Sequence, residues 1–320
     1  MLNQILVPLD GSDFAECVLP HVTAMARAFN AQVHLIQITE QISLTEPTAT
    51  VDPLTWRLRK TEADLYLNSI KERLENKGLA VEKALLEGHA VDQIARFIED
   101  KSADLMILGS HGHQEHGFSD WNMSFAVQQI LRRHLMSTLI VRCTEGAATE
   151  TDELQYRRLL VPLDGSRRAE SVLPIATTLA QEHDAELLLV HVVVKPEMAR
   201  RMPLNQEDQE LLSRFVSRNA EEGRLYLEQL HAHLRGNIRT LLQTSDDVPT
   251  TLQDITEREQ VDLMVLTAHG YSGNPRWAYG SVTNRFIADG TIPLLIIQDL
   301  PVDTFQPVPV EAATRLPGQR

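Results

Sequence analysis

The sequence predicts an α/β protein built from two doubly wound, five-stranded parallel-sheet sandwiches in tandem. The first observation is a repeat: the stretch from Leu6 to Pro20 returns from Leu160 to Pro174 with twelve of fifteen aligned positions identical. The second is that short apolar runs alternate with helical patterns, which is typical of a parallel sheet covered on both faces. The third is length, because 320 residues provide two domains of about 150 residues.

The order of elements in the first half follows from hydrophobic periodicity and turn residues. An apolar run ends at Asp10-Gly11-Ser12, and a helical pattern follows it. The expected strands are 4–9, 32–39, 79–86, 104–108 and 138–142. The expected helices are 18–29, 54–76, 91–99 and 124–134. The second half repeats this plan, with strands near Arg158, Glu186, Ile238, Asp262 and Leu294.

The expected domain organisation places a first domain at 1–143, a linker at 144–156, a second domain at 157–299 and a proline-containing tail at 300–320. The linker is acidic and rich in small residues, and the tail is expected to lack regular structure. The last strands of the two halves would otherwise be exposed sheet edges. We therefore expect 138–142 to lie against 294–298 as an intramolecular pseudo-dimer, with a further homodimer and an unidentified protein partner left open.

Net charge and composition exclude several classes of partner. A formal charge of −14 argues against nucleic acid, which needs clustered Lys and Arg. No apolar stretch approaches the length of a membrane span, and no leader-like segment opens the chain, so a cytoplasmic location is expected. The two cysteines, Cys17 and Cys143, make no disulfide framework.

Aspartate follows the first strand of each half, and a His-Gly pair follows the fourth. In doubly wound sheets, ligands bind beyond the carboxyl ends of the strands, where strand order reverses. If strands one and four are neighbours, both turns face one crevice. The alternative for Asp10 and Asp164 is local capping of backbone N–H groups, and loop glycines often serve only a turn.

The opening Val-Pro-Leu-Asp-Gly-Ser, together with His-Gly after Asp-Leu-Met, resembles the universal stress protein family over essentially the whole chain as a tandem pair. The resemblance implies a Rossmann-like fold of the adenine nucleotide alpha hydrolase type. It also implies a loop of pattern G-x2-G-x9-G-[ST], which holds ATP phosphates at a helix N-terminus in members that bind ATP. Such a helix start offers unpaired N–H groups to an anion.

In the second half this loop reads Thr267-Ala-His-Gly270, then nine residues, then Gly280-Ser281, so only the first glycine is replaced. The resemblance implies that Asp164 and the backbone of Val192 hold the adenine end, with Pro162 lining the pocket. The residues implied for ribose and phosphates are Gly270, Gly280, Ser281 and Val282, and Thr267 can still present its N–H.

The first half departs from the pattern in the complementary place. Gly109 and Gly112 are kept, but Ser124-Phe125 stands at the helix start, where phenylalanine offers no phosphate ligand. We expect this copy to bind ATP weakly or not at all, although Asp10 and Ile38 could accept a different ligand.

A metal site and an enzyme are the competing hypotheses. His111, His113 and His116 are close enough in sequence to suggest zinc, yet His111 belongs to the family motif and the other two lie in a polar loop. Magnesium carried by ATP is the expected metal. The sequence lacks a Walker loop, a Gly-x-Gly-x-x-Gly after the first strand and a nucleophile elbow. No catalytic residue is therefore assigned, and at most slow ATP hydrolysis is expected.

We therefore expect an ATP- or adenine-nucleotide-binding protein that acts as a stress-response sensor or regulator through its second half. The alternatives are a nucleotide-independent interaction module of the same fold and a weak ATPase.

Overall fold

The computed structural model describes residues 2–12, 15–39, 53–110, 125–133, 136–142, 154–196, 206–271 and 278–299. Their strands form one ten-stranded sheet with the order β3-β2-β1-β4-β5-β10-β9-β6-β7-β8. The strands of the first half are β1 (Gln4–Leu9), β2 (Gln32–Thr39), β3 (Val81–Glu87), β4 (Leu105–Gly109) and β5 (Ser137–Val141). Those of the second are β6 (Arg158–Leu163), β7 (Glu186–Val194), β8 (Ile238–Ser245), β9 (Leu263–Thr267) and β10 (Leu294–Ile297).

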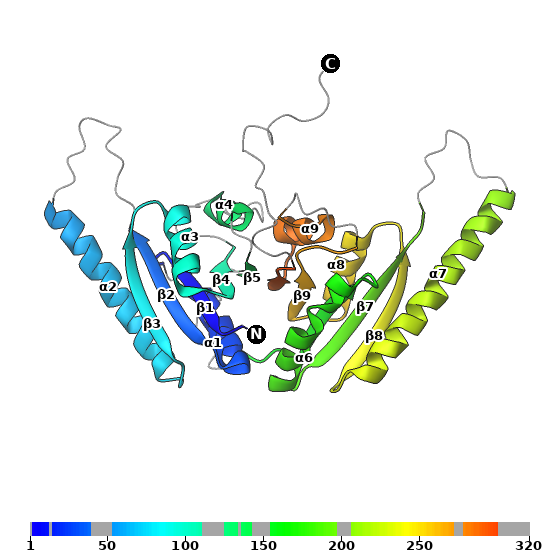
Figure 1. Ribbon diagram of the computed structural model, residues 1–320, viewed down its shortest axis with the longest axis horizontal. Coiled ribbons are helices and arrows are strands. Elements are labelled where there is room, and N and C mark those ends of the chain that lie inside the picture. Colours follow the sequence, from blue (N-terminus) through cyan, green and yellow to red (C-terminus); the bar gives the residue numbers. More distant parts are fainter. Residues whose placement is uncertain are drawn as a thin grey trace, which may run out of the picture.

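Each half is a parallel five-stranded sheet, as expected, and the two halves meet edge to edge. Strands β5 and β10 pair antiparallel, with Leu294 opposite Ile140 and Leu295 opposite Leu139. The last strand of each half thereby covers the other, and Figure 1 shows the two halves arranged symmetrically about this pair. The predicted sandwiches are thus continuous through one mixed sheet.

Two helical layers cover the sheet, as Figure 1 shows. One layer contains the short helices η1 (Ala15–Val18) and α5 (Arg167–Glu170) and the helices α1 (Leu19–Phe29), α2 (Pro53–Glu75), α6 (Leu173–Glu182) and α7 (Gln206–His233). The other contains α3 (Ala90–Lys101), α4 (Phe125–Arg133), α8 (Val248–Arg258) and α9 (Ser281–Asp289). Strand side chains alternate between the layers: Ile5 and Val7 lie in one core and Leu6 in the other.

The strand order within each half creates the reversal at which ligands are expected. Strand β1 lies between β2 and β4, and β6 lies between β7 and β9. The loops after β6 and β9 are therefore neighbours at the carboxyl edge of the second half. The condition stated from the sequence, that strands one and four are neighbours, therefore holds in both halves.

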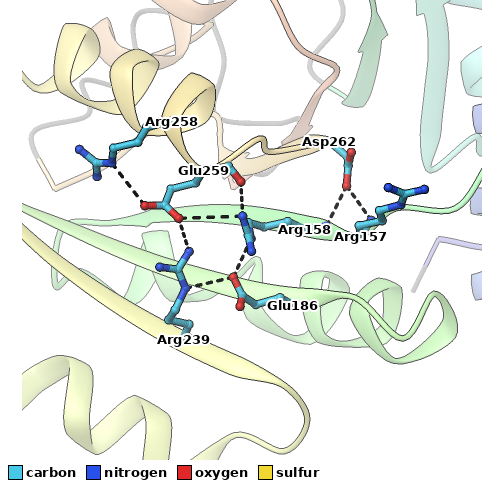
Figure 2. A network of polar contacts seen from close by, with 7 residues as sticks. All are labelled: Arg157, Arg158, Glu186, Arg239, Arg258, Glu259 and Asp262. Carbon is cyan, nitrogen blue, oxygen red and sulfur yellow. Dashed lines mark hydrogen bonds and ion pairs between the residues drawn. The ribbon is translucent and has the colours of Figure 1, made fainter.

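Charged side chains hold the opposite edge of the second half together, as Figure 2 shows. Arg158 Nε lies 2.7 Å from Glu186 Oε1, and Arg239 bridges Glu186 to Glu259 with distances of 3.1 and 2.5 Å. Asp262 Oδ2 accepts the backbone N–H groups of Arg157 and Arg158 at 2.6 and 2.8 Å. This network ties the starts of β6, β7 and β8 to the end of α8, far along the strands from the carboxyl edge.

One sequence expectation needs correction. Cys17 is disulfide-bonded in this structure, whereas the cysteines were expected to form no disulfide framework. The chain's other cysteine, Cys143, lies outside the described residues. Sequence spacing could not decide the matter, because two cysteines far apart in the chain pair only if the fold brings them together.

Candidate functional site

Asp164 joins the two loops at the carboxyl edge of the second half. Its Oδ1 accepts the backbone N–H of Ser166 at 2.9 Å, and its Oδ2 accepts that of Tyr271 at 2.5 Å. The first bond belongs to the local turn after β6, whereas the second reaches the loop after β9. Asp164 therefore accepts a local backbone N–H group, as the alternative interpretation predicted, and it also links the two loops across the predicted crevice.

The position of the Asp164 carboxylate leaves no space for a Cβ atom at Gly270 unless that carboxylate shifts. A Cβ atom added at Gly270 would approach Asp164 Oδ2 more closely than real Cβ contacts allow. No positive φ is involved, so the requirement is for space rather than for backbone conformation. The glycine lets the loop after β9 approach the carboxylate directly.

The N-terminus of α9 is open at the same place. Gly280 is its N-cap residue, its N–H bonds to Ala268 O at 2.7 Å, and no side chain in the described part of the chain caps the helix. The first backbone bond within the helix runs from Asn284 N–H to Gly280 O at 2.9 Å. The N–H groups of residues 281–283 therefore have no partner within the helix, which is the usual condition for anion binding.

The Thr267 side chain stabilises the loop after β9 through a hydrogen bond. Its hydroxyl donates to His269 O at 2.7 Å, and its own carbonyl accepts the hydroxyl of Thr283 at 3.0 Å. The side chain of Thr267 is buried, and its hydroxyl is satisfied by the bond to His269 O, so a threonine is accommodated where the family pattern has its first glycine. Thr283 was not singled out in the sequence, although its position in the first turn of α9 was a signal.

A buried hydrogen bond between His269 and Asp299 supports the loop after β9. His269 Nδ1 lies 2.9 Å from Asp299 Oδ1, and both side chains are almost fully buried. Arg168 Nε, in α5, lies 3.6 Å from the other carboxylate oxygen of Asp299. The motif identified His269 in advance, but nothing local to Asp299 indicated that the end of the second half would reach the loop.

These elements enclose a cavity of about 720 Å³. The cavity is lined by all eight residues singled out in the second half: Pro162, Asp164, Val192, Thr267, Gly270, Gly280, Ser281 and Val282. Its volume lies in the range of sites for small molecules and cofactors. The structure thus brings together residues that are up to 120 positions apart in the sequence.

The cavity walls differ in polarity along its length. Val190, Val192, Val248 and Leu252 provide an apolar wall from β7 and α8, while Gly270 and the start of α9 provide backbone N–H groups. Such a site suits a molecule with a flat apolar part and an anionic end. Neither Lys nor Arg is among the described lining residues. The N-terminus of α9 is therefore the main source of positive potential among the described walls of the cavity.

Three aromatic residues that the sequence analysis did not single out also line the cavity: His191, Tyr271 and Tyr279. Tyr279 is buried and lines the cavity, and burial raises the pKa of its hydroxyl above the usual range. His191 Nδ1 lies 2.8 Å from Leu163 O, and its ring packs against Tyr226 with centroids 5.9 Å apart. Burial is also the main cause of a raised pKa for Tyr226, with Glu170 and Asp164 adding to it. Both tyrosine hydroxyls therefore stay protonated at neutral pH.

The first half is described in part. Asp10 Oδ1 accepts the backbone N–H and the hydroxyl of Ser12 at 2.9 and 2.6 Å, and Gly109 ends β4. Ile38 lies on β2, partly buried. The remaining candidates, Gly112, Ser124 and the histidines His111, His113 and His116, lie outside the described residues. Within the described ranges, no group of three or more His, Cys, Asp or Glu residues could hold a metal ion.

Comparison with known proteins agrees with the repeat. The family model described as "Universal stress protein family" matches residues 1–142 and 155–298. A universal stress protein of Methanocaldococcus jannaschii, MJ0531, is 29% identical over 113 residues, which cover 35% of this chain and 66% of that protein. The match therefore spans slightly less than two thirds of that relative.

Solved structures show the same fold over nearly the full length. A universal stress protein from Archaeoglobus fulgidus is 14% identical with a TM-score of 0.63, covering 93% of this chain and 99% of that one. A putative universal stress protein from Pseudomonas aeruginosa is 13% identical with a TM-score of 0.65, covering 95% of each chain. In the described part of this chain, no helix is long and apolar enough to cross a membrane.

Proposed function

Because this chain belongs to the universal stress protein family, we propose that its second half binds ATP or a related adenine nucleotide and that it acts as a stress-response sensor or regulator. The observation that carries the proposal is the single cavity lined by all eight candidate residues. Its apolar wall suits an adenine ring, and the open start of α9 suits phosphates. Magnesium would be held mainly by the phosphates of the nucleotide.

The roles proposed for the side chains follow from their placement. Each oxygen of Asp164 already accepts one backbone N–H, and each retains a second lone pair for a ligand donor such as a ribose hydroxyl or an adenine amine. The N–H groups of Ser281 and Val282 would face the phosphates. The antiparallel joint of β5 and β10 would serve as an internal pseudo-dimer interface, which leaves homodimerisation unnecessary for covering these edges.

The first test is to identify what the purified protein carries. Small molecules released from freshly purified protein are analysed by mass spectrometry, and ATP is then titrated into the protein with and without Mg²⁺. One solved universal stress protein holds cAMP, so cAMP is titrated as well. Retained nucleotide and saturable ATP binding are the expected results. No released nucleotide and no saturable binding would sink the proposal and favour an interaction module, whereas product formation well above blank would favour an ATPase.

A matched pair of variants locates the site. A Cβ at Gly280 would meet nothing nearer than Ala268 O at 3.5 Å, so side chains fit there. Asp and Asn are both preferred N-cap residues, and Gly280→Asp differs from Gly280→Asn by one charge. We expect both variants to melt at or above the wild-type temperature, and Gly280→Asp to bind ATP about tenfold more weakly than Gly280→Asn, because its carboxylate repels phosphates at the helix start. Equal ATP affinity for the two would place the phosphates elsewhere.

A further inference from the structure

The C-terminal end of α9 is held by a residue from the other half of the chain. Arg142 directly follows β5, and its Nη2 donates to Phe286 O at 2.6 Å and to Ile287 O at 2.9 Å. The last four carbonyls of a helix have no partner in the following turn. Arg142 therefore supplies a donor to Ile287 O and a second donor to Phe286 O, which also accepts the Gly290 N–H at 3.0 Å.

The Arg142 guanidinium is charged and lies at the C-terminal end of α9. Burial lowers the pKa of Arg142 to about 10, and nearby Asp289 opposes that shift, so the side chain stays protonated at neutral pH. A cation stabilises a helix at its C-terminus, where the helix dipole is negative. Gly290 keeps the place open, because a Cβ there would lie 2.5 Å from Phe286 O and 3.3 Å from Arg142 Nη2.

The opposite end of the same helix is the proposed phosphate site. Helix α9 has nine residues and spans about 13 Å at the usual rise per residue. Its first turn lines the cavity and its last turn contacts Arg142. A short helix moves as a unit, so fixing one end fixes the direction of the N–H groups at the other.

The two halves differ at this position. Arg142 follows the last residue of β5, and Gln298 follows the last residue of β10, so the two are equivalent in the repeat. Gln298 carries no charge, and its buried Nε2 has no hydrogen-bond partner among the described residues. Arg142 thus contacts α9, the helix that begins at the intact Gly280-Ser281 pair of the second half. Arg142 itself belongs to the first half, whose loop departs from the family pattern.

We propose that Arg142 is a positioning residue through which the first half tunes phosphate binding in the second half. The inference rests on the proposed function, since it needs an anionic ligand at the start of α9. It assigns the degenerate half a role that does not require a ligand of its own. By linkage, a ligand at the start of α9 also strengthens the contact at the end of α9.

The test separates positioning from general stability by comparing ATP with adenosine, which has no phosphate. Both ligands are titrated into the wild type, Arg142→Gln, which installs the residue found at the equivalent position, and Arg142→Lys, which keeps the charge. The matched control is Arg285→Gln: it removes the same charge from exposed α9 surface, where Arg285 pairs with Asp289 at 2.8 Å. Hydrogen exchange of the Gly290 N–H, which bonds to Phe286 O, is followed with and without ATP.

We expect Arg142→Gln to weaken ATP binding about fivefold or more, the lower range of coupling between sites, while adenosine affinity is unchanged. Arg142→Lys should restore part of the loss, Arg285→Gln should change little, and ATP should slow exchange at Gly290 in the wild type more than in Arg142→Gln. Equal weakening of both ligands, or ATP affinity unaffected by Arg142→Gln, overturns this inference alone. Wild-type protein that binds neither ligand overturns the proposed function and this inference together.

Discussion

Tyr156 and His21 are hydrogen-bonded across the two halves, with the phenol oxygen 2.7 Å from the imidazole Nδ1. His21 lies on α1 of the first half, and Tyr156 precedes β6 of the second. Both side chains are buried, and the ring of His183 packs edge-on against Tyr156 with centroids 4.9 Å apart. The contact belongs to the packing of α1 against α6, so the halves are joined in a helical layer as well as through β5 and β10.

The first prediction concerns acid stability. Burial lowers the pKa of His21 to about 4 from an ordinary value of 6.5. The unfolded chain then binds more protons than the folded one between these values, so stability falls as pH drops from 6.5 toward 4. From pH 7.5 to pH 5 we expect His21 to account for a loss of about 2 kcal/mol. Urea unfolding of wild type and His21→Asn at both pH values measures it.

Asn is chosen because its amide can replace Nδ1 as the partner of Tyr156 without titrating. Part of the pH dependence should survive in this variant, since burial also lowers the pKa of His183. An identical loss of stability in His21→Asn and wild type would show that His21 is not the group responsible.

The second prediction concerns the close approach at the site. Gly270→Ala forces the Asp164 carboxylate off the Tyr271 N–H, because the new Cβ would clash with Oδ2. We expect a loss of stability of about 1 kcal/mol, the net contribution of one hydrogen bond, because the Tyr271 N–H is exposed to solvent, together with weaker ATP binding. Thermal melting and ATP titration report the two effects.

A double-mutant cycle tests the assigned cause. Asp164→Ala removes the carboxylate, so adding Gly270→Ala to it should cost much less than adding it to the wild type. Additive losses would mean that Gly270 is needed for a reason unrelated to Asp164.

The third prediction uses a reversal of charge between the halves. Glu82 and Lys101 form a pair at 3.0 Å in the first half, whereas the equivalent positions hold Arg239 and Glu259. Glu259 also contacts Arg258 and is much less exposed than Glu82. Glu259→Gln should therefore destabilise the protein by about 1 kcal/mol, and Lys101→Met should destabilise it less.

The same pairs give a pH and salt signature. The ion pairs hold the pKa of Glu259 and of Glu82 below its usual range, so their stabilisation is present above the ordinary glutamate pKa and is lost as pH falls through the lowered value. The melting temperature of each variant relative to wild type is measured at low and high salt. Losses that are equal for the two variants would contradict the difference in burial.

The fourth prediction concerns the joint between the halves. Strands β5 and β10 each leave a row of backbone groups unpaired if the partner is removed. Residues 1–153 and 154–320, produced as separate chains, should therefore associate on mixing, as measured by size-exclusion chromatography with light scattering. If the two mixed chains remain separate monomers, each with a cooperative melting transition, then the pairing of β5 with β10 contributes little to the association of the halves.

Much of the fold could be predicted from local pattern. The apolar run at Gln4–Leu9 and its repeat at Arg158–Leu163 form strands as expected, and Asn30 ends α1 in a left-handed conformation just after its periodic pattern stops. The candidate residues of the second half also line one cavity, because turns at the carboxyl ends of adjacent parallel strands lie at one edge. Their contact with a nucleotide stays a prediction.

What the sequence by itself determined is therefore the repeat, the alternation of strands and helices, and the chemistry of the loops, since these depend on neighbours in the chain. Only the tertiary structure decided that the halves share one sheet, that Asp164 reaches Tyr271 N–H, and that Arg142 holds the end of α9. The physical reason is that such contacts join residues about 100 or more positions apart. Their partners are selected by packing and by the pairing of buried polar groups, which local periodicity does not encode.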